Sequence, residues 1–213
     1  MSSYTEGQIH QLANALEGDG FIPDDVTKLG QYKELTSIRG VLRGTHEIKP
    51  IVNHDVNFQK WRTITLGRYK SASDYLSALG RAKISVSFCA KDILSKQKFT
   101  VSEIETEVDV AIVTVAKLGF KNGAQYGEIC ARAKELGLNL CPAEVGPSLR
   151  LAFEETVIEI WRHIAMEAVI DSGGYQYVFS LGSNGYDSWL STRYGRPDLF
   201  WDSDSRFVFV LCK

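Results

Sequence analysis

The sequence predicts an α+β protein with a helical N-terminal part, a mixed core built on one central strand at about residues 108–116, and an antiparallel, aromatic-rich meander at the C-terminus. Apolar residues recur at helical spacing mainly in the first two thirds of the 213-residue chain. Residues 110–116, VAIVTVA, form its longest apolar run and are rich in β-branched side chains. Three of the four tryptophans follow residue 150, in short alternating segments separated by glycine-containing turns.

The N-terminal part is predicted to be a helical extension and connector, residues 1–57, followed by an α+β core domain at residues 58–213. Its first helix carries four apolar residues at helical spacing, Ile9, Leu12, Ala13 and Leu16. Gly18 is a typical stop signal for this helix. Pro50 lies in a stretch without clean periodicity, which indicates an extended connector. We expect the whole chain to form a single compact unit.

The first half of the core domain alternates between strand and helix patterns. We expect, in order, a strand at 61–67, a helix at 71–83, a helix at 85–96, the central strand and a helix at 124–137. Gly67 ends the first strand and Gly137 the last helix. Serines at the start of the first two helices provide N-caps. The central run is apolar on both faces, which is typical of a strand covered on both sides.

The second half is expected to consist of strands. Residues 148–153, SLRLAF, are predicted to enter the sheet as a strand, with Arg150 facing away from the core because successive strand residues alternate. Residues 159–170 fit a helix by period, but the turn DSGG that follows favours a strand in a hairpin. The remaining predicted strands are residues 175–181, 188–194 and 206–212.

One candidate site lies in the block ELGLNLCPAEVGPSLRL, residues 135–151. Glu144 and Arg150 are the carboxylate and guanidinium of this block. They fit a catalytic site, with His163 of the following strand as a third group. They also fit a structural joint in which Glu144 accepts backbone N–H groups or pairs with Arg150, and we favour this interpretation.

The same block, together with the C-terminal pattern WL…FW…RFVFV, resembles a family of uncharacterised bacterial proteins. The resemblance covers roughly residues 58–213. It implies a bacterial origin and a shared fold. Because no activity is known for that family, it implies no catalytic residues.

A second candidate site lies in the C-terminal strands, where aromatic side chains stand beside arginines. Tryptophan and tyrosine next to arginine are common at binding surfaces. The predicted ligand-binding residues are Trp189, Arg193, Tyr194, Arg196 and Trp201. The alternative is that the two tryptophans only cover the hydrophobic core.

Several classes of function are disfavoured by composition and motifs. The net charge of −2 argues against a nucleic-acid-binding protein, because such proteins usually carry a basic field. No apolar run is long enough to cross a bilayer, and no secretory signal is present, so we expect a cytoplasmic protein. The pairs His46–Glu47 and His54–Asp55 have no known metal-ligand spacing, and the glycine-rich turns are not phosphate-binding motifs. We therefore expect neither metal nor cofactor.

The sequence favours a non-catalytic binding or interaction protein whose partner is an unknown small molecule or protein. The ligand would bind at the aromatic and arginine-bearing edge of the C-terminal sheet. The alternative is a hydrolase or transferase that uses Glu144 and Arg150.

Overall fold

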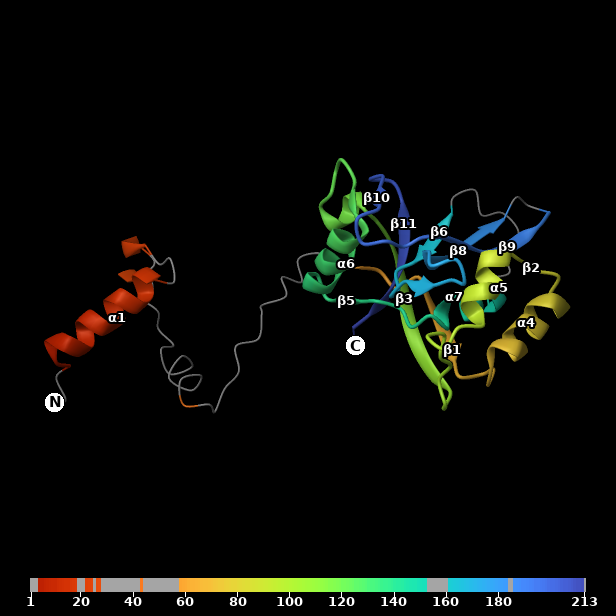
Figure 1. The fold of residues 1–213 in the computed structure, drawn as a ribbon, viewed down its shortest axis with the longest axis horizontal. Helices are drawn as coiled ribbons and strands as arrows, with labels where there is room; N and C mark the ends of the chain where they lie inside the picture. The colour runs from red at the N-terminus through yellow and green to blue at the C-terminus, as the bar shows by residue number, and fades with distance from the viewer. Residues whose placement is uncertain are drawn as a thin grey trace. The chain divides into compact units, whose positions relative to one another are not determined.

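The computed structural model describes residues 4–18, 22–24, 26–27, 43, 58–152, 161–183 and 186–212. The chain divides into two units, residues 1–51 and 52–213, and each is described by itself (Figure 1). In the first unit, helix α1 spans Glu6–Gly18, so the predicted helix and its end are confirmed. None of its side chains is buried. The predicted connector, with the two His–acid pairs, lies outside the described residues.

The second unit is an α+β structure, and this predicted fold class is confirmed. Among the described residues, seven strands follow one another across a mixed sheet in the order β1-β3-β11-β6-β8-β9-β2. Their bounds are Arg62–Leu66, Thr106–Thr114, Arg206–Leu211, Arg162–Ile164, Gln176–Ser183, Ser188–Tyr194 and Ser85–Val86. Strands β5 (Leu138–Asn139) and β7 (Val169–Ile170) pair with β11 and β8, and β4 (Ala124–Gln125) pairs with β10 (Phe200–Trp201).

The pairing of β11 differs from that of a simple C-terminal meander. Strands β8 and β9 form an antiparallel hairpin, and β6 and β7 both pair with β8, in agreement with the expected strand character of residues 159–170. Strand β11 then pairs with β3 in antiparallel fashion and with β6 in parallel. The segment after β9 explains this arrangement. Its strand β10 pairs with β4 outside the main sheet, and the chain then re-enters the main sheet between β3 and β6 as β11.

The helices begin where the sequence provides caps. Helix α4 (Ala72–Arg81) is capped by Ser71, and α5 (Phe88–Leu94) is capped by Ser87. Helix α6 (Tyr126–Glu135) has a capping box, in which Gln125 and Glu128 satisfy each other's backbone N–H groups. No helix in the part of the chain that the structure describes is long and apolar enough to cross a membrane.

The predicted strand at residues 148–153 is wrong, because Val145–Ala152 form helix α7. Pro147 lies in the first turn of α7, where its missing N–H removes no helical hydrogen bond. Val145 and Leu149 share one helical face and are both fully buried. Arg150 is also buried, with 2% of its surface exposed, so its predicted orientation away from the core is wrong as well.

The two faces of the sheet are covered by different helices. Gly146 of α7 lies against the ring of Phe179, and α4 and α5 lie on this same side. On the other face, Tyr126 of α6 contacts Phe207 of β11, with ring centroids 5.7 Å apart. Figure 1 shows α6 on one side of the sheet, and α4, α5 and α7 on the other. The second face is only partly covered by α6, and the remaining area holds the candidate site.

The contact between α7 and the sheet predicts opposite effects for two helical glycines. A Cβ at Gly146 would lie 2.6 Å from the ring of Phe179, whereas a Cβ at Gly80 of α4 would meet nothing within 4 Å. We expect Gly146→Ala to lower the free energy of unfolding by about 1–3 kcal/mol through overpacking. Gly80→Ala should raise it by about 0.5–1 kcal/mol, because alanine favours the helix. Urea unfolding of both variants measures the difference, and similar effects would contradict the close approach of α7.

Candidate functional site

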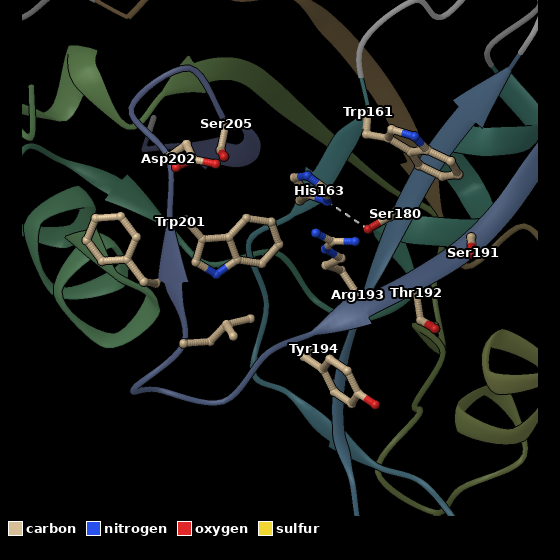
Figure 2. Close-up of a pocket in the computed structure, with 12 residues that line it drawn as sticks. Trp161, His163, Ser180, Ser191, Thr192, Arg193, Tyr194, Trp201, Asp202 and Ser205 are labelled. Atoms are coloured by element: carbon tan, nitrogen blue, oxygen red, sulfur yellow. Dashed lines mark hydrogen bonds between the residues drawn. The ribbon is translucent and has the colours of Figure 1, made fainter. Parts of the chain in front are cut away.

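The candidate site is a cavity of about 630 Å³ on the sheet face that α6 leaves partly open (Figure 2). Phe207, His163, Ser180 and Ser191 are in register across four neighbouring strands, β11, β6, β8 and β9. Side chains in register on adjacent strands point to the same face of a sheet. His163, Ser180 and Ser191 line the cavity. We call this cavity the aromatic pocket. Its volume lies in the range that usually holds a small organic ligand.

Two tryptophans from distant parts of the chain flank this row. Trp201 of β10 is 95% buried, and its ring centroid lies 4.5 Å from that of His163. Trp161 precedes β6 and lies against Gly182, where a Cβ would be 2.6 Å from the indole ring. Figure 2 shows the two indoles on either side of His163. The pocket therefore has apolar, aromatic walls and a floor that carries hydroxyl and imidazole groups.

Arg193 brings to this pocket a positive charge that no described residue pairs with. Its guanidinium is exposed and makes no hydrogen bond or ion pair with the residues that the structure describes. The nearby Arg196 is different, because Nε and Nη2 donate to the two oxygens of Asp198 at 3.0 and 2.7 Å. Arg196 does not line the pocket. Arg193 is thus available to a ligand, and Arg196 is held by its own partner.

His163 is a neutral side chain in the floor of the pocket. Its Nδ1 lies 2.8 Å from the hydroxyl oxygen of Ser180, and only 8% of its surface is exposed. Burial, together with the positive charge of Arg193, lowers its pKa to about 3. Its Nε2 makes no hydrogen bond with the described residues. The imidazole therefore offers a ligand one neutral polar atom.

The structure brings together some of the predicted site residues and separates others. Arg193, Tyr194 and Trp201 line the aromatic pocket, as does His163, which was predicted as a partner of Glu144. Trp189 is half-buried and stacks behind Trp161, with centroids 6.4 Å apart, rather than lining the pocket itself.

Trp161, Ser180 and Asp202 are among the lining residues that were not predicted from the sequence. The alternation of β8 places Ser180 opposite in direction to its neighbours Phe179 and Leu181, and this polar interruption of an apolar strand was the available signal. Trp161 and Asp202 flank short strands whose pairing partners are far away in sequence. No local pattern could therefore place them at the same cavity.

Glu144 lies in a different environment, sealed inside the protein with 1% of its surface exposed. Its carboxylate accepts hydrogen bonds from the backbone N–H of Gly67 at 2.7 Å and of Ser102 at 2.8 Å. The hydroxyl of Tyr75 donates a third, also at 2.7 Å. Burial raises the pKa of Tyr75, so this hydroxyl stays protonated and serves as a donor. Because its single proton points to Glu144, Ser148 must donate in the 2.5 Å hydrogen bond between Ser148 and Tyr75.

Arg150 is not among the hydrogen-bond partners of Glu144. It lies six residues further along the chain, within α7, and is buried. Burial, together with the positive charge of Arg162, lowers the pKa of its guanidinium. The strand prediction implied a direct contact between Glu144 and Arg150. Because residues 145–152 form a helix instead, Glu144 accepts hydrogen bonds from backbone N–H groups and from Tyr75.

A change at Glu144 should affect stability strongly. In Glu144→Gln an amide N–H₂ group replaces one acceptor oxygen and faces a backbone N–H group. We expect the free energy of unfolding to fall by about 1–3 kcal/mol, because a buried donor loses its acceptor. The control is Glu135→Gln, an exposed carboxylate paired with Arg132, which should change stability by no more than about 0.5 kcal/mol. Equal unfolding midpoints in urea for the two variants would contradict the buried network.

The low pKa of His163 should make the protein less stable in acid. Between pH 6.5 and about 3 the unfolded chain binds a proton on this histidine and the folded chain does not. Folding stability therefore falls as the pH decreases through this range, by up to about 1.4 kcal/mol per pH unit. In His163→Gln this contribution is absent, so the variant should lose less stability in acid than the wild type. Urea unfolding at a series of pH values tests this, and parallel profiles for the two proteins would refute it.

Comparisons with known protein families, with curated proteins and with solved structures gave no match. The resemblance to a family of uncharacterised bacterial proteins therefore stays a prediction. In the part of the chain that the structure describes, no group of three or more His, Cys, Asp or Glu side chains could hold a metal ion. The function must be inferred from the side chains of the aromatic pocket.

Proposed function

We propose that this chain is a non-catalytic binding protein that holds a small ligand with a flat apolar part and an anionic group in the aromatic pocket. The observation that carries this proposal is the guanidinium of Arg193. It lines a cavity with aromatic walls and makes no hydrogen bond or ion pair with the described residues. Guanidinium groups bind carboxylates and phosphates through two parallel hydrogen bonds. The indoles of Trp161 and Trp201 supply apolar surface for the rest of the ligand.

The protonation state of His163 supports binding rather than acid–base catalysis. A general acid or base works best when its pKa lies near the pH at which the enzyme operates. The pKa of His163 is lowered to about 3 by burial and by Arg193, so it is a weak base that stays neutral around pH 7. A neutral imidazole beside Arg193 leaves the whole positive charge of the guanidinium for the ligand.

The alternative, a hydrolase or transferase built on Glu144 and Arg150, has less support. All three hydrogen bonds to the carboxylate of Glu144 come from the protein itself, and the residue is 1% exposed. A substrate would have to displace these donors to reach it. His163, the third residue of that alternative, lines the aromatic pocket, and Glu144 does not.

A pair of fluorescent probes tests the proposal. The probes are 1-anilinonaphthalene-8-sulfonate, which is anionic, and N-phenyl-1-naphthylamine, its uncharged analogue. Arg193→Gln should weaken binding of the anionic probe about five- to tenfold, because one charge-assisted contact is lost. Binding of the uncharged analogue should change little. The control Arg196→Gln removes an arginine that is already paired and should affect neither probe.

Two outcomes would overturn the proposal. One is an equal loss of both probes in an Arg193→Gln variant that keeps the urea unfolding midpoint of the wild type, which would mean that Arg193 does not recognise the negative charge. The other is binding of the anionic probe that is insensitive to Arg193→Gln, which would place the anion elsewhere. Quenching of tryptophan fluorescence by each bound probe provides a second readout, since Trp161 and Trp201 line the pocket.

A further inference from the structure

The aromatic pocket also contains a carboxylate that has no partner among the described residues. Asp202 follows β10, is exposed, and lines the pocket. Its side chain makes no hydrogen bond or ion pair with the residues described by the structure, and it is not paired with Arg193. Figure 2 shows Asp202 apart from Arg193, with the rings of Trp201 and His163 between them. The two opposite charges are thus both available and are separated by polar and aromatic surface.

The balance of charge around the pocket limits the charge of its ligand. Among the described residues that line it, Arg193 is the cation and Asp202 the anion, and His163 is neutral. A ligand with two or more negative charges would have Arg193 as its partner and Asp202 as a repulsive neighbour. A ligand with one group of each sign would satisfy both. Nucleotides and other polyanions are therefore disfavoured.

The surface between the two charges is suited to a neutral polar group. Ser180, Ser191 and Ser205 line the pocket and carry hydroxyl groups that can donate or accept. Nε2 of His163 makes no hydrogen bond with the described residues. An amide has one donor and one acceptor, and such a group lies between the amine and the carboxylate of a dipeptide.

We propose that the ligand of the aromatic pocket is a small zwitterion of dipeptide size with an aromatic side chain. Its carboxylate pairs with Arg193, its ammonium group with Asp202, and its ring lies between the indoles of Trp161 and Trp201. This inference rests on the proposed function, because it assigns a ligand class to the same pocket.

Four related probes test each charge separately. They are phenylalanyl-glycine, which is a zwitterion; its N-acetyl derivative, which keeps only the negative charge; its C-terminal amide, which keeps only the positive charge; and free phenylalanine, whose charges are close together. Isothermal titration should give the tightest binding for phenylalanyl-glycine. Loss of either charge should weaken binding about three- to tenfold, as expected for a partly exposed ion pair. Phenylalanine should also bind more weakly, because its two charges are attached to one carbon atom, whereas Arg193 and Asp202 stand apart in the pocket.

The variant Asp202→Asn gives the sharpest result, because its effect should reverse in sign between two probes. It should weaken binding of phenylalanyl-glycine about three- to tenfold, since the ammonium group loses its partner. It should leave unchanged or strengthen binding of the N-acetyl derivative, since a repulsive charge is removed. The matched control is Asp204→Asn in the same turn, which does not line the pocket and should affect neither probe.

The outcomes separate this inference from the proposed function. If the N-acetyl derivative binds as tightly as phenylalanyl-glycine and Asp202→Asn affects both alike, the zwitterion is refuted and an anionic ligand at Arg193 remains. If none of the four probes binds and the anionic naphthalene probe still depends on Arg193, the dipeptide class is refuted and the pocket is retained. If no probe depends on Arg193, both proposals fail.

Discussion

The buried carboxylate of Glu144 is the interaction on which the arrangement of the second unit depends. It receives hydrogen bonds from the end of β1, from the loop after α5 and from α4, while its own backbone leads directly into α7. Four segments of the chain, between Gly67 and α7, therefore meet at one carboxylate. A buried charge is tolerated only when its hydrogen-bonding capacity is satisfied, so the position of each donor is fixed closely. The chain conformation at Gly67 follows from this, since its φ of 77° and the backbone of Ile104 nearby leave no room for a side chain.

This joint supports the aromatic pocket although it is not part of it. Helix α7 lies on one face of the sheet, against Phe179, and the pocket lies on the other face, above Ser180. The two residues are neighbours on β8, so the position of the strand under α7 also sets the position of the pocket floor. Binding residues that sit on strands of a rigid sheet are held more accurately than residues on loops. The buried polar cluster around Glu144 and the aromatic pocket thus lie on opposite faces of one sheet.

The local elements could be predicted from the sequence, and the reason is that their signals are local. Serine caps, the glycine after β1 and the β-branched run of β3 each specify the conformation of a few neighbouring residues. The strand prediction for residues 148–153 failed because alternation was judged over too few residues. A short helix with a proline in its first turn gives the same pattern over that length. Arg150 was then assigned to the wrong environment, because its orientation depends on whether the period is two or 3.6. A charged residue in the core is also rare enough that sequence reasoning places it outside by default.

Which residues line the pocket depends on the pairing of strands that are distant in sequence, and no short sequence pattern specifies this pairing. His163, Ser180 and Ser191 meet through the registers of three strands, and Trp201 reaches them because β10 pairs with β4 instead of the main sheet. The aromatic and arginine composition of the C-terminal segment indicated a binding surface. It could not distinguish Arg193 from Arg196, because the difference is the presence of Asp198 within reach of only one of them.

Gly182 allows one aromatic wall of the pocket to lie directly against the backbone of the sheet. This glycine is the penultimate residue of β8, and the indole of Trp161 occupies the space that a side chain would need. Glycine in a strand often marks such a close approach. A single methyl group at this position would displace one wall and leave the guanidinium, the carboxylate and the hydroxyl groups in place. The absence of a side chain at Gly182 therefore sets how far apart the walls of the pocket stand. Under the proposed function, a variant with a side chain at this position should accept ligands of the same charge pattern but of a different thickness.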